Sequence, residues 1–143
     1  MYLDFSEYQN LGGTLDFTAF SNYEYEAEAT LNWYTFNRLK NWNSYPEEVQ
    51  RCMVRLIELA KFEAELLFAI SGSNLSEGGA SIASQSNDGV SISYNTISAS
   101  EAFNTLQTKS GGNVIEQTVK RYLSGLKDSK GRNILYRGVY EDE

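Results

Sequence analysis

The stretch TLDFTAFSNYEYEAEATLNWYTFNRLK, residues 14–40, decides the fold class of this chain. Thr14 or Asp16 offers a side-chain acceptor for a helix start, and the apolar residues that follow recur at spacings of three and four. This apolar face consists of Phe20, Tyr23, Ala27, Leu31 and Tyr34. We therefore predict an amphipathic helix over residues 15–40. Glu24 and Glu28 share one side of it, and we expect them to form a solvated stripe.

Capping signals predict four further helices. Each begins at an acceptor side chain that is followed three residues later by glutamate, and the helix at Ser44 also has proline in its first turn. These helices are predicted over residues 4–11, 46–70, 98–108 and 113–126. The second, third and fifth of the five helices should form the core. The inward residues are predicted to be Phe20, Ala27, Leu31, Met53, Leu56, Ala60, Val119 and Tyr122.

Residues 81–95 interrupt the helical pattern. The stretch SQSNDGVSISYNTI, residues 84–97, alternates polar and apolar residues around an Asn-Asp-Gly turn signal, which predicts a β-hairpin. A three-residue loop pairs Ile82 with Tyr94 and Ser84 with Ile92, and it also places Val90 on the same apolar face. An isolated hairpin is only marginally stable in water. We expect either the helices or a neighbouring subunit to cover it.

The C-terminal stretch GRNILYRGVYEDE, residues 131–143, is apolar without a helical period. Tyrosine and arginine are enriched at interface hot spots, and a chain end would otherwise tend to fray. One interpretation is a strand or arm that folds back on the protein's own core. The other is an extended arm that docks on another protein. Its binding residues would be Arg132, Ile134, Leu135, Tyr136, Arg137, Val139 and Tyr140.

Together these patterns predict a mainly α fold, a small helical bundle with one β-hairpin insertion and an extended C-terminal arm. A length of 143 residues is typical of a single domain, here over residues 1–143. The single Cys52 excludes an intramolecular disulfide framework. No leader peptide and no apolar run of roughly 18 residues is recognisable, so neither export nor membrane insertion is expected.

The charge is unevenly distributed along the chain. The net charge is −7, which argues against binding to nucleic acid irrespective of sequence, because that affinity comes from cations that displace counterions from phosphate. Residues 1–70 carry 11 acidic and 5 basic side chains, whereas residues 109–137 carry 7 basic and 2 acidic ones. This asymmetry indicates either an acidic body with a basic arm that meets an acidic partner, or two solvated surfaces.

Catalytic patterns are weak in this sequence. It contains no histidine, and Cys52 lies in an apolar helical pattern that is typical of a buried structural thiol. No glycine-rich motif follows a strand and opens a helix, as nucleotide sites require. The sequence predicts no catalytic, cofactor-binding or metal-binding residues, and no enzymatic activity is expected.

Five stretches, taken in order, resemble the head-tail connector proteins of long-tailed bacteriophages, which are also called adaptor or head-completion proteins. The stretches are MYLDFSEYQNLGGTLDFTAF (1–20), LNWYTFNRL (31–39), PEEVQRCMVRLIEL (46–59), SNDGVSISY (86–94) and NILYRGVY (133–140). The resemblance implies a non-catalytic helical subunit in a homo-oligomeric ring, typically dodecameric. The ring would dock on the portal protein, contact a downstream stopper or tail-completion protein, and extend the DNA channel toward the tail.

The resemblance also implies a location in the neck of the virion, and in the host cytoplasm during assembly. DNA would pass through without specific binding, because a channel lined with carboxylates repels phosphate. In such a ring the hairpin would supply an inter-subunit patch, and the C-terminal arm would grip the portal. The inter-subunit patch would consist of Ile82, Ser84, Val90, Ile92 and Tyr94. The alternative is a small helical adaptor module that binds one protein partner through its basic C-terminal arm. Oligomeric state distinguishes the two, because the connector would form a ring whereas the adaptor module would stay monomeric or dimeric.

Overall fold

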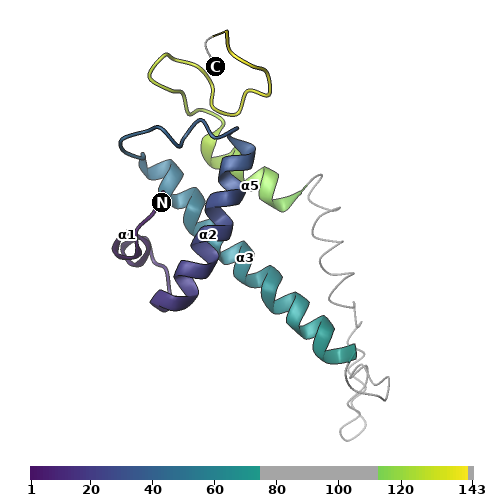
Figure 1. Cartoon of the computed structure of the whole chain (residues 1–143). Helices are drawn as coiled ribbons and strands as arrows, with labels where there is room; N and C mark the ends of the chain where they lie inside the picture. Colours follow the sequence, from purple (N-terminus) through teal and green to yellow (C-terminus); the bar gives the residue numbers. More distant parts are fainter. Residues whose placement is uncertain (75–112, 142–143) are drawn as a thin grey trace, which may run out of the picture. The chain divides into compact units, whose positions relative to one another are not determined.

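The computed structural model describes residues 1–74 and 113–141, and for residues 70–74 it describes the backbone alone (Figure 1). The chain divides into two compact units, Met1–Lys61 with Asn113–Glu143, and Phe62–Gly112. The predicted mainly helical fold is confirmed over the described residues. The predicted helix over residues 98–108 and the hairpin over residues 81–95 lie outside the described residues, and the single-domain assignment stays a prediction.

Helix α1, Phe5–Asn10, begins at the predicted capping box. The Asp4 carboxylate accepts from the Glu7 amide at 2.7 Å, and the Glu7 carboxylate accepts from the Asp4 amide at 3.0 Å. Beyond the helix, the backbone at Gly13 packs closely on the Tyr8 ring. A Cβ atom at this position would lie 2.2 Å from a ring carbon, which is too close for a real contact. The Tyr8 hydroxyl accepts from the amide of Thr14 at 3.2 Å. Only glycine therefore fits at position 13.

Helix α2, Phe17–Tyr34, is shorter than the predicted 15–40. It begins at Asp16, whose carboxylate accepts from the Ala19 amide at 2.9 Å. It ends because Phe36 and Asn37 adopt left-handed backbone angles, with φ of 54° and 60°, which a right-handed helix cannot contain. Residues 35–41 form turns instead. The reversal places Leu39 in the core with no exposed surface.

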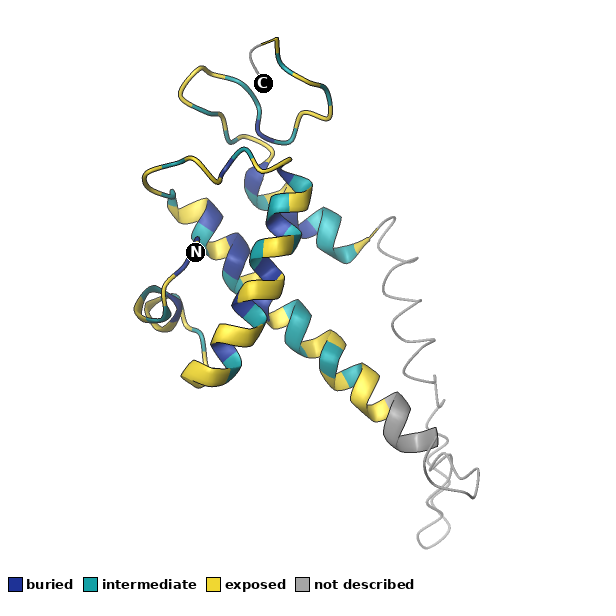
Figure 2. Ribbon diagram, viewed as in Figure 1, coloured by how far each residue is buried: buried dark blue, intermediate teal, exposed yellow. Residues whose placement is uncertain are grey.

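Helices α3 and α5 complete the described bundle. Helix α3, Glu47–Asn74, begins one residue after the predicted start at Pro46 and extends four residues beyond the predicted end. Helix α5, Val114–Leu123, begins at Asn113, whose side chain accepts from the Ile115 amide at 2.8 Å, and it ends earlier than the predicted 126. Helix α5 packs against α2. The inner faces of α2, α5 and the first part of α3 enclose the buried residues of the first unit (Figure 2).

Six of the eight predicted core residues are buried: Phe20, Ala27, Leu31, Met53, Leu56 and Val119. Ala60 on α3 and Tyr122 on α5 are only partly buried. On α5 the inward face is centred on Val119 and Leu123 instead of Tyr122. Five buried residues come from outside the helices, namely Tyr2, Leu3, Thr35, Leu39 and Ile134. Cys52 is buried as expected, and burial raises the pKa of its thiol to about 12. A thiol of this kind is a packing group, since the reactive form is the thiolate.

Glu24 contradicts the expectation of a solvated stripe, because it is only 7% exposed. It lies beside Tyr2 and Glu28, and one of its carboxylate oxygens has no hydrogen-bond partner among the described residues. Glu28 instead pairs with the amino group of Met1 at 2.8 Å. Burial, and then the charge of Glu28, raise the pKa of Glu24. The N-terminal segment covers this side of α2. The spacing of apolar residues within the helix cannot reveal a contact with a segment outside it.

The core assignment predicts a large cost for shortening Leu56, which is 3% exposed. Leu56→Ala should lower the free energy of unfolding by about 2–5 kcal/mol, the range for a buried leucine whose removal leaves a cavity. Denaturant titration followed by circular dichroism measures this. Leu59→Ala on the same helix is the matched control, because Leu59 is only partly buried and should cost less. Equal costs for the two variants would contradict the assignment.

Glu24→Gln should stabilise the protein at neutral pH by about 1 kcal/mol, the scale of one poorly satisfied buried polar group. The raised folded-state pKa means that the native state favours protonated Glu24. The advantage of glutamine should therefore be full above that raised pKa and should vanish below the ordinary value of 4.5. Thermal unfolding across pH 3 to 8 measures the difference. A variant that is less stable than the wild type at pH 7 would show that the carboxylate is a stabilising group.

Candidate functional site

Arg38 fastens the C-terminal segment, residues 124–141, to the first unit. Its guanidinium donates to the carbonyl oxygens of Ile134 at 3.2 Å, Tyr136, and Gly138 at 2.7 Å. A guanidinium carries five donors in a rigid fork, so one side chain satisfies several carbonyls of an irregular segment. The early end of α2 makes this contact possible, because the following turns present Arg38 to the segment rather than continuing the helix.

A compact turn precedes the residues that Arg38 holds. Asp128 accepts from the Arg132 amide at 2.9 Å and from its guanidinium at 2.7 Å. These contacts with Arg132 lower the pKa of Asp128. Lys127 and Asn133 form an antiparallel bridge, and Gly131 has a φ of 76°, a region that glycine adopts readily. The turn directs the chain back toward the helices.

Tyr140 holds the far end of the C-terminal segment. Its hydroxyl donates to the carbonyl oxygen of Asn133 at 3.0 Å. The centre of its ring lies 4.9 Å from the guanidinium carbon of Arg38 and 4.7 Å from that of Arg132. Such cation–π contacts favour a fixed ring position. The segment is therefore closed on itself and on the end of α2.

The predicted partner-binding residues separate into two groups. Ile134 belongs to the core, whereas Leu135 packs against it; Arg132 and Tyr140 take part in the contacts described above. The second group is exposed and consists of Tyr136, Arg137 and Val139. The prediction of an extended arm over residues 131–143 is not confirmed, because the described part of that range folds back on the first unit. The reason is the burial of Ile134 together with the carbonyl contacts of Arg38.

A groove of about 520 Å³ lies between the end of α2, the turn that follows it, α5 and the C-terminal segment. Its aromatic walls include Trp33 and Phe36, and Val119 and Leu135 supply apolar surface. The complete lining is Asn32, Trp33, Tyr34, Phe36, Asn37, Glu116, Val119, Lys120, Leu135 and Arg137. We refer to this site as the α2–α5 groove. Its volume falls within the roughly 300–1,000 Å³ that is common for binding sites.

Glu116 organises the charge in the α2–α5 groove. Its carboxylate lies 2.7 Å from the Lys120 ammonium and 2.9 Å from the Arg137 guanidinium. The hydrogen bond and charge of Lys120, and then the charge of Arg137, lower the pKa of Glu116. Burial, and then the Glu116 carboxylate, raise the pKa of Tyr34. One carboxylate thus faces two cations, and these charged groups carry a net positive charge that suits an anionic ligand group.

Helix α2 also carries aromatic residues on its outward side, which the sequence interpretation missed. Tyr25 and Trp33 are each 72% exposed, and Ala29 between them is exposed as well. These three residues follow one another at intervals of four and so share one side of the helix. This second apolar series in the sequence is the signal that could have revealed them. A helix that is apolar on two sides normally has a partner on each.

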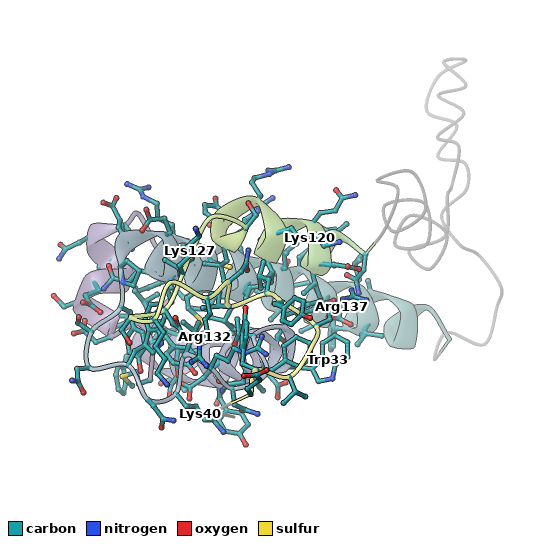
Figure 3. The ribbon with its side chains drawn as sticks, turned by 90° about the horizontal axis from the view of Figure 1, so that it is seen from above. Trp33, Lys40, Lys120, Lys127, Arg132 and Arg137 are labelled. Atoms are coloured by element: carbon teal, nitrogen blue, oxygen red, sulfur yellow. The ribbon has the colours of Figure 1, made fainter. Side chains whose placement is uncertain are left out.

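Charge is divided between two stretches of the first unit. Residues 1–37 carry six carboxylate side chains and no lysine or arginine, whereas residues 113–137 carry six cations against two carboxylates. Helix α2 runs from the acidic end toward the C-terminal segment (Figure 1). Seen from above, cations surround that segment (Figure 3). The labelled cations are Lys40, Lys120, Lys127, Arg132 and Arg137.

Residues 1–74 and 113–141 contain no cluster of three or more side chains suited to hold a metal ion. No helix in this part of the chain has the length and apolar character that crossing a bilayer requires. The predicted inter-subunit residues of the hairpin lie outside it. No family model, curated protein or solved structure matches the chain.

Arg38→Lys should release the C-terminal segment, because one ammonium cannot reproduce the planar fork that reaches three carbonyls. We expect trypsin to cleave after Arg137 at least tenfold faster in this variant, while helical circular dichroism changes little. The control is Lys40→Met, an exposed cation two residues away. Unchanged cleavage in Arg38→Lys would show that the segment is held by other contacts.

Proposed function

We propose that this protein is a non-catalytic assembly subunit, a head-tail connector whose ring docks on a portal and extends the DNA channel toward the tail. The order of the five resembling stretches supports this proposal, and it also implies the dodecameric ring and the virion neck. The observation that carries it is the exposed apolar surface of the first unit. Apolar side chains in water favour burial against another molecule. This surface includes Trp33, Phe36, Tyr136 and Val139.

The exposed part of the C-terminal segment is the proposed portal contact. Val139 is 82% exposed, and the side chain of Arg137 is 76% exposed. Tyr136 directly precedes Arg137 and is also exposed, whereas Ile134 serves the subunit's own core. A rigid, folded segment loses less conformational entropy on binding than a free arm would. The segment therefore docks as a preformed surface, and Arg137 favours a carboxylate on the portal.

The acidic residues support the proposed passage of DNA without specific binding. The first 37 residues contribute six carboxylate side chains and no lysine or arginine. If this end of the unit lines the channel, it repels the phosphate backbone, and the DNA slides without being held. The cations at the other end are then available for contacts with portal or stopper proteins.

The alternative is an adaptor module that binds one protein partner. The α2–α5 groove favours it, because aromatic walls beside Lys120 and Arg137 suit a single acidic peptide. Such a module needs no copies of itself. The predicted basic arm is replaced in this alternative by the groove and the folded C-terminal segment.

Electron microscopy and sedimentation of the purified protein, with and without the portal protein of the same virus, test the proposal. We expect closed rings, either alone or on the portal. Tyr136→Ser/Val139→Ser should remain folded and bind portal at least tenfold more weakly. Phe17→Ser is the matched control, because Phe17 is an exposed aromatic residue at the other end of α2. Monomers under both conditions would contradict the proposal, and a monomer that binds one peptide would favour the adaptor module.

A further inference from the structure

Tyr25 and the α2–α5 groove lie at different points along one helix. Tyr25 and Trp33 are eight residues apart, which is about 12 Å along the helix axis at 1.5 Å per residue. Trp33 lines the groove, whereas Tyr25 does not. Both features belong to the first unit. A subunit thus carries a projecting aromatic side chain and a separate recess.

The groove offers what a tyrosine flanked by acids requires. Trp33 and Phe36 provide aromatic walls, and Lys120 and Arg137 provide the cations. An aromatic side chain in such a recess gains both apolar burial and ring contacts. Its hydroxyl remains near polar groups at the rim. Binding of this kind would also cover Trp33, which a lone subunit leaves 72% exposed.

Charge complementarity identifies the occupant. Tyr25 lies between Glu24 and Glu26 in sequence, and Glu26 is exposed beside it. The whole surrounding stretch up to residue 37 contains no lysine or arginine. Among the described residues, Lys120 and Arg137 of the groove share one carboxylate, that of Glu116. An acidic, aromatic helix face is therefore the matching partner, and this chain itself supplies one.

We propose that the α2–α5 groove of one copy receives Tyr25 and Glu26 of a second copy. This inference rests on the proposed function, in which copies associate, and it names the contact between them. Because the two surfaces differ, the contact is heterologous when each copy gives Tyr25 to one neighbour and its groove to the other, and it then repeats from copy to copy. Such a contact closes into a ring when the rotation per copy divides a full turn, and otherwise it forms an open chain.

Mixing two defective variants tests this directly. Tyr25→Asp removes the projecting ring but keeps the groove, and Trp33→Asp damages the groove but keeps Tyr25. Each variant alone should be monomeric in sedimentation velocity runs, with self-association weakened at least tenfold. An equimolar mixture should form dimers and nothing larger, because only one intact contact remains per pair. Phe36→Asp is a second groove variant, and aspartate tolerates its left-handed backbone. Tyr25→Phe should associate like the wild type.

The inference is wrong if the wild type stays monomeric, if either variant associates normally, or if the mixture yields no dimers. Failure of the proposed function gives a different result. Wild-type protein that forms open chains through this contact would keep the inference and refute the ring. Rings that tolerate Tyr25→Asp and Trp33→Asp would keep the ring and refute the contact.

Discussion

The fork of hydrogen bonds from Arg38 to the C-terminal segment is the contact on which that segment and the α2–α5 groove depend. Three carbonyl oxygens of an irregular segment converge on one guanidinium, and Ile134 beside them fills the core. Without this contact those carbonyls would need water, and the segment would have little reason to stay folded. The walls of the α2–α5 groove follow from it, since Leu135 and Arg137 belong to the same segment.

The end of α2 at Tyr34 is the local feature that allows Arg38 to reach the C-terminal segment. Phe36 and Asn37 adopt left-handed angles, which cost energy for residues with a side chain. The surrounding structure compensates for this cost, because Leu39 becomes fully buried and Thr35 donates its hydroxyl to the Leu31 carbonyl at 2.8 Å. Phe36 meanwhile forms a wall of the groove. A longer helix would lose the Arg38 contact and one wall of the recess.

The sequence predicted the features that depend on local chemistry. The capping box of Asp4, the start of α5 at Asn113 and the inward positions of Phe20 and Leu56 follow from neighbouring residues and helical period. It did not predict the end of α2, although Asn37 is a residue type that takes the left-handed angle ending a helix more readily than most. Beyond that point the chain is held by the contacts of Arg38 with residues nearly 100 positions away.

The candidate site was predicted only in part. Tyrosine and arginine in residues 131–140 indicated a binding segment, but composition cannot say that Ile134 faces inward while Val139 faces water. Trp33 and Tyr25 were missed because only one apolar face of α2 was sought. Glu24 was misplaced because the N-terminal segment covers it, a contact between residues that no helical period links.

Hydrogen–deuterium exchange of the free subunit and of its assembled form tests most directly whether the C-terminal segment is a folded binding surface. The amide of Ile134, which donates to the Leu126 carbonyl at 3.3 Å, should be protected in both states. The amides of residues 137–139 should gain protection only on assembly. Rapid exchange at Ile134 in the free subunit, with protection appearing only on assembly, would contradict this and would show a free arm that folds on binding.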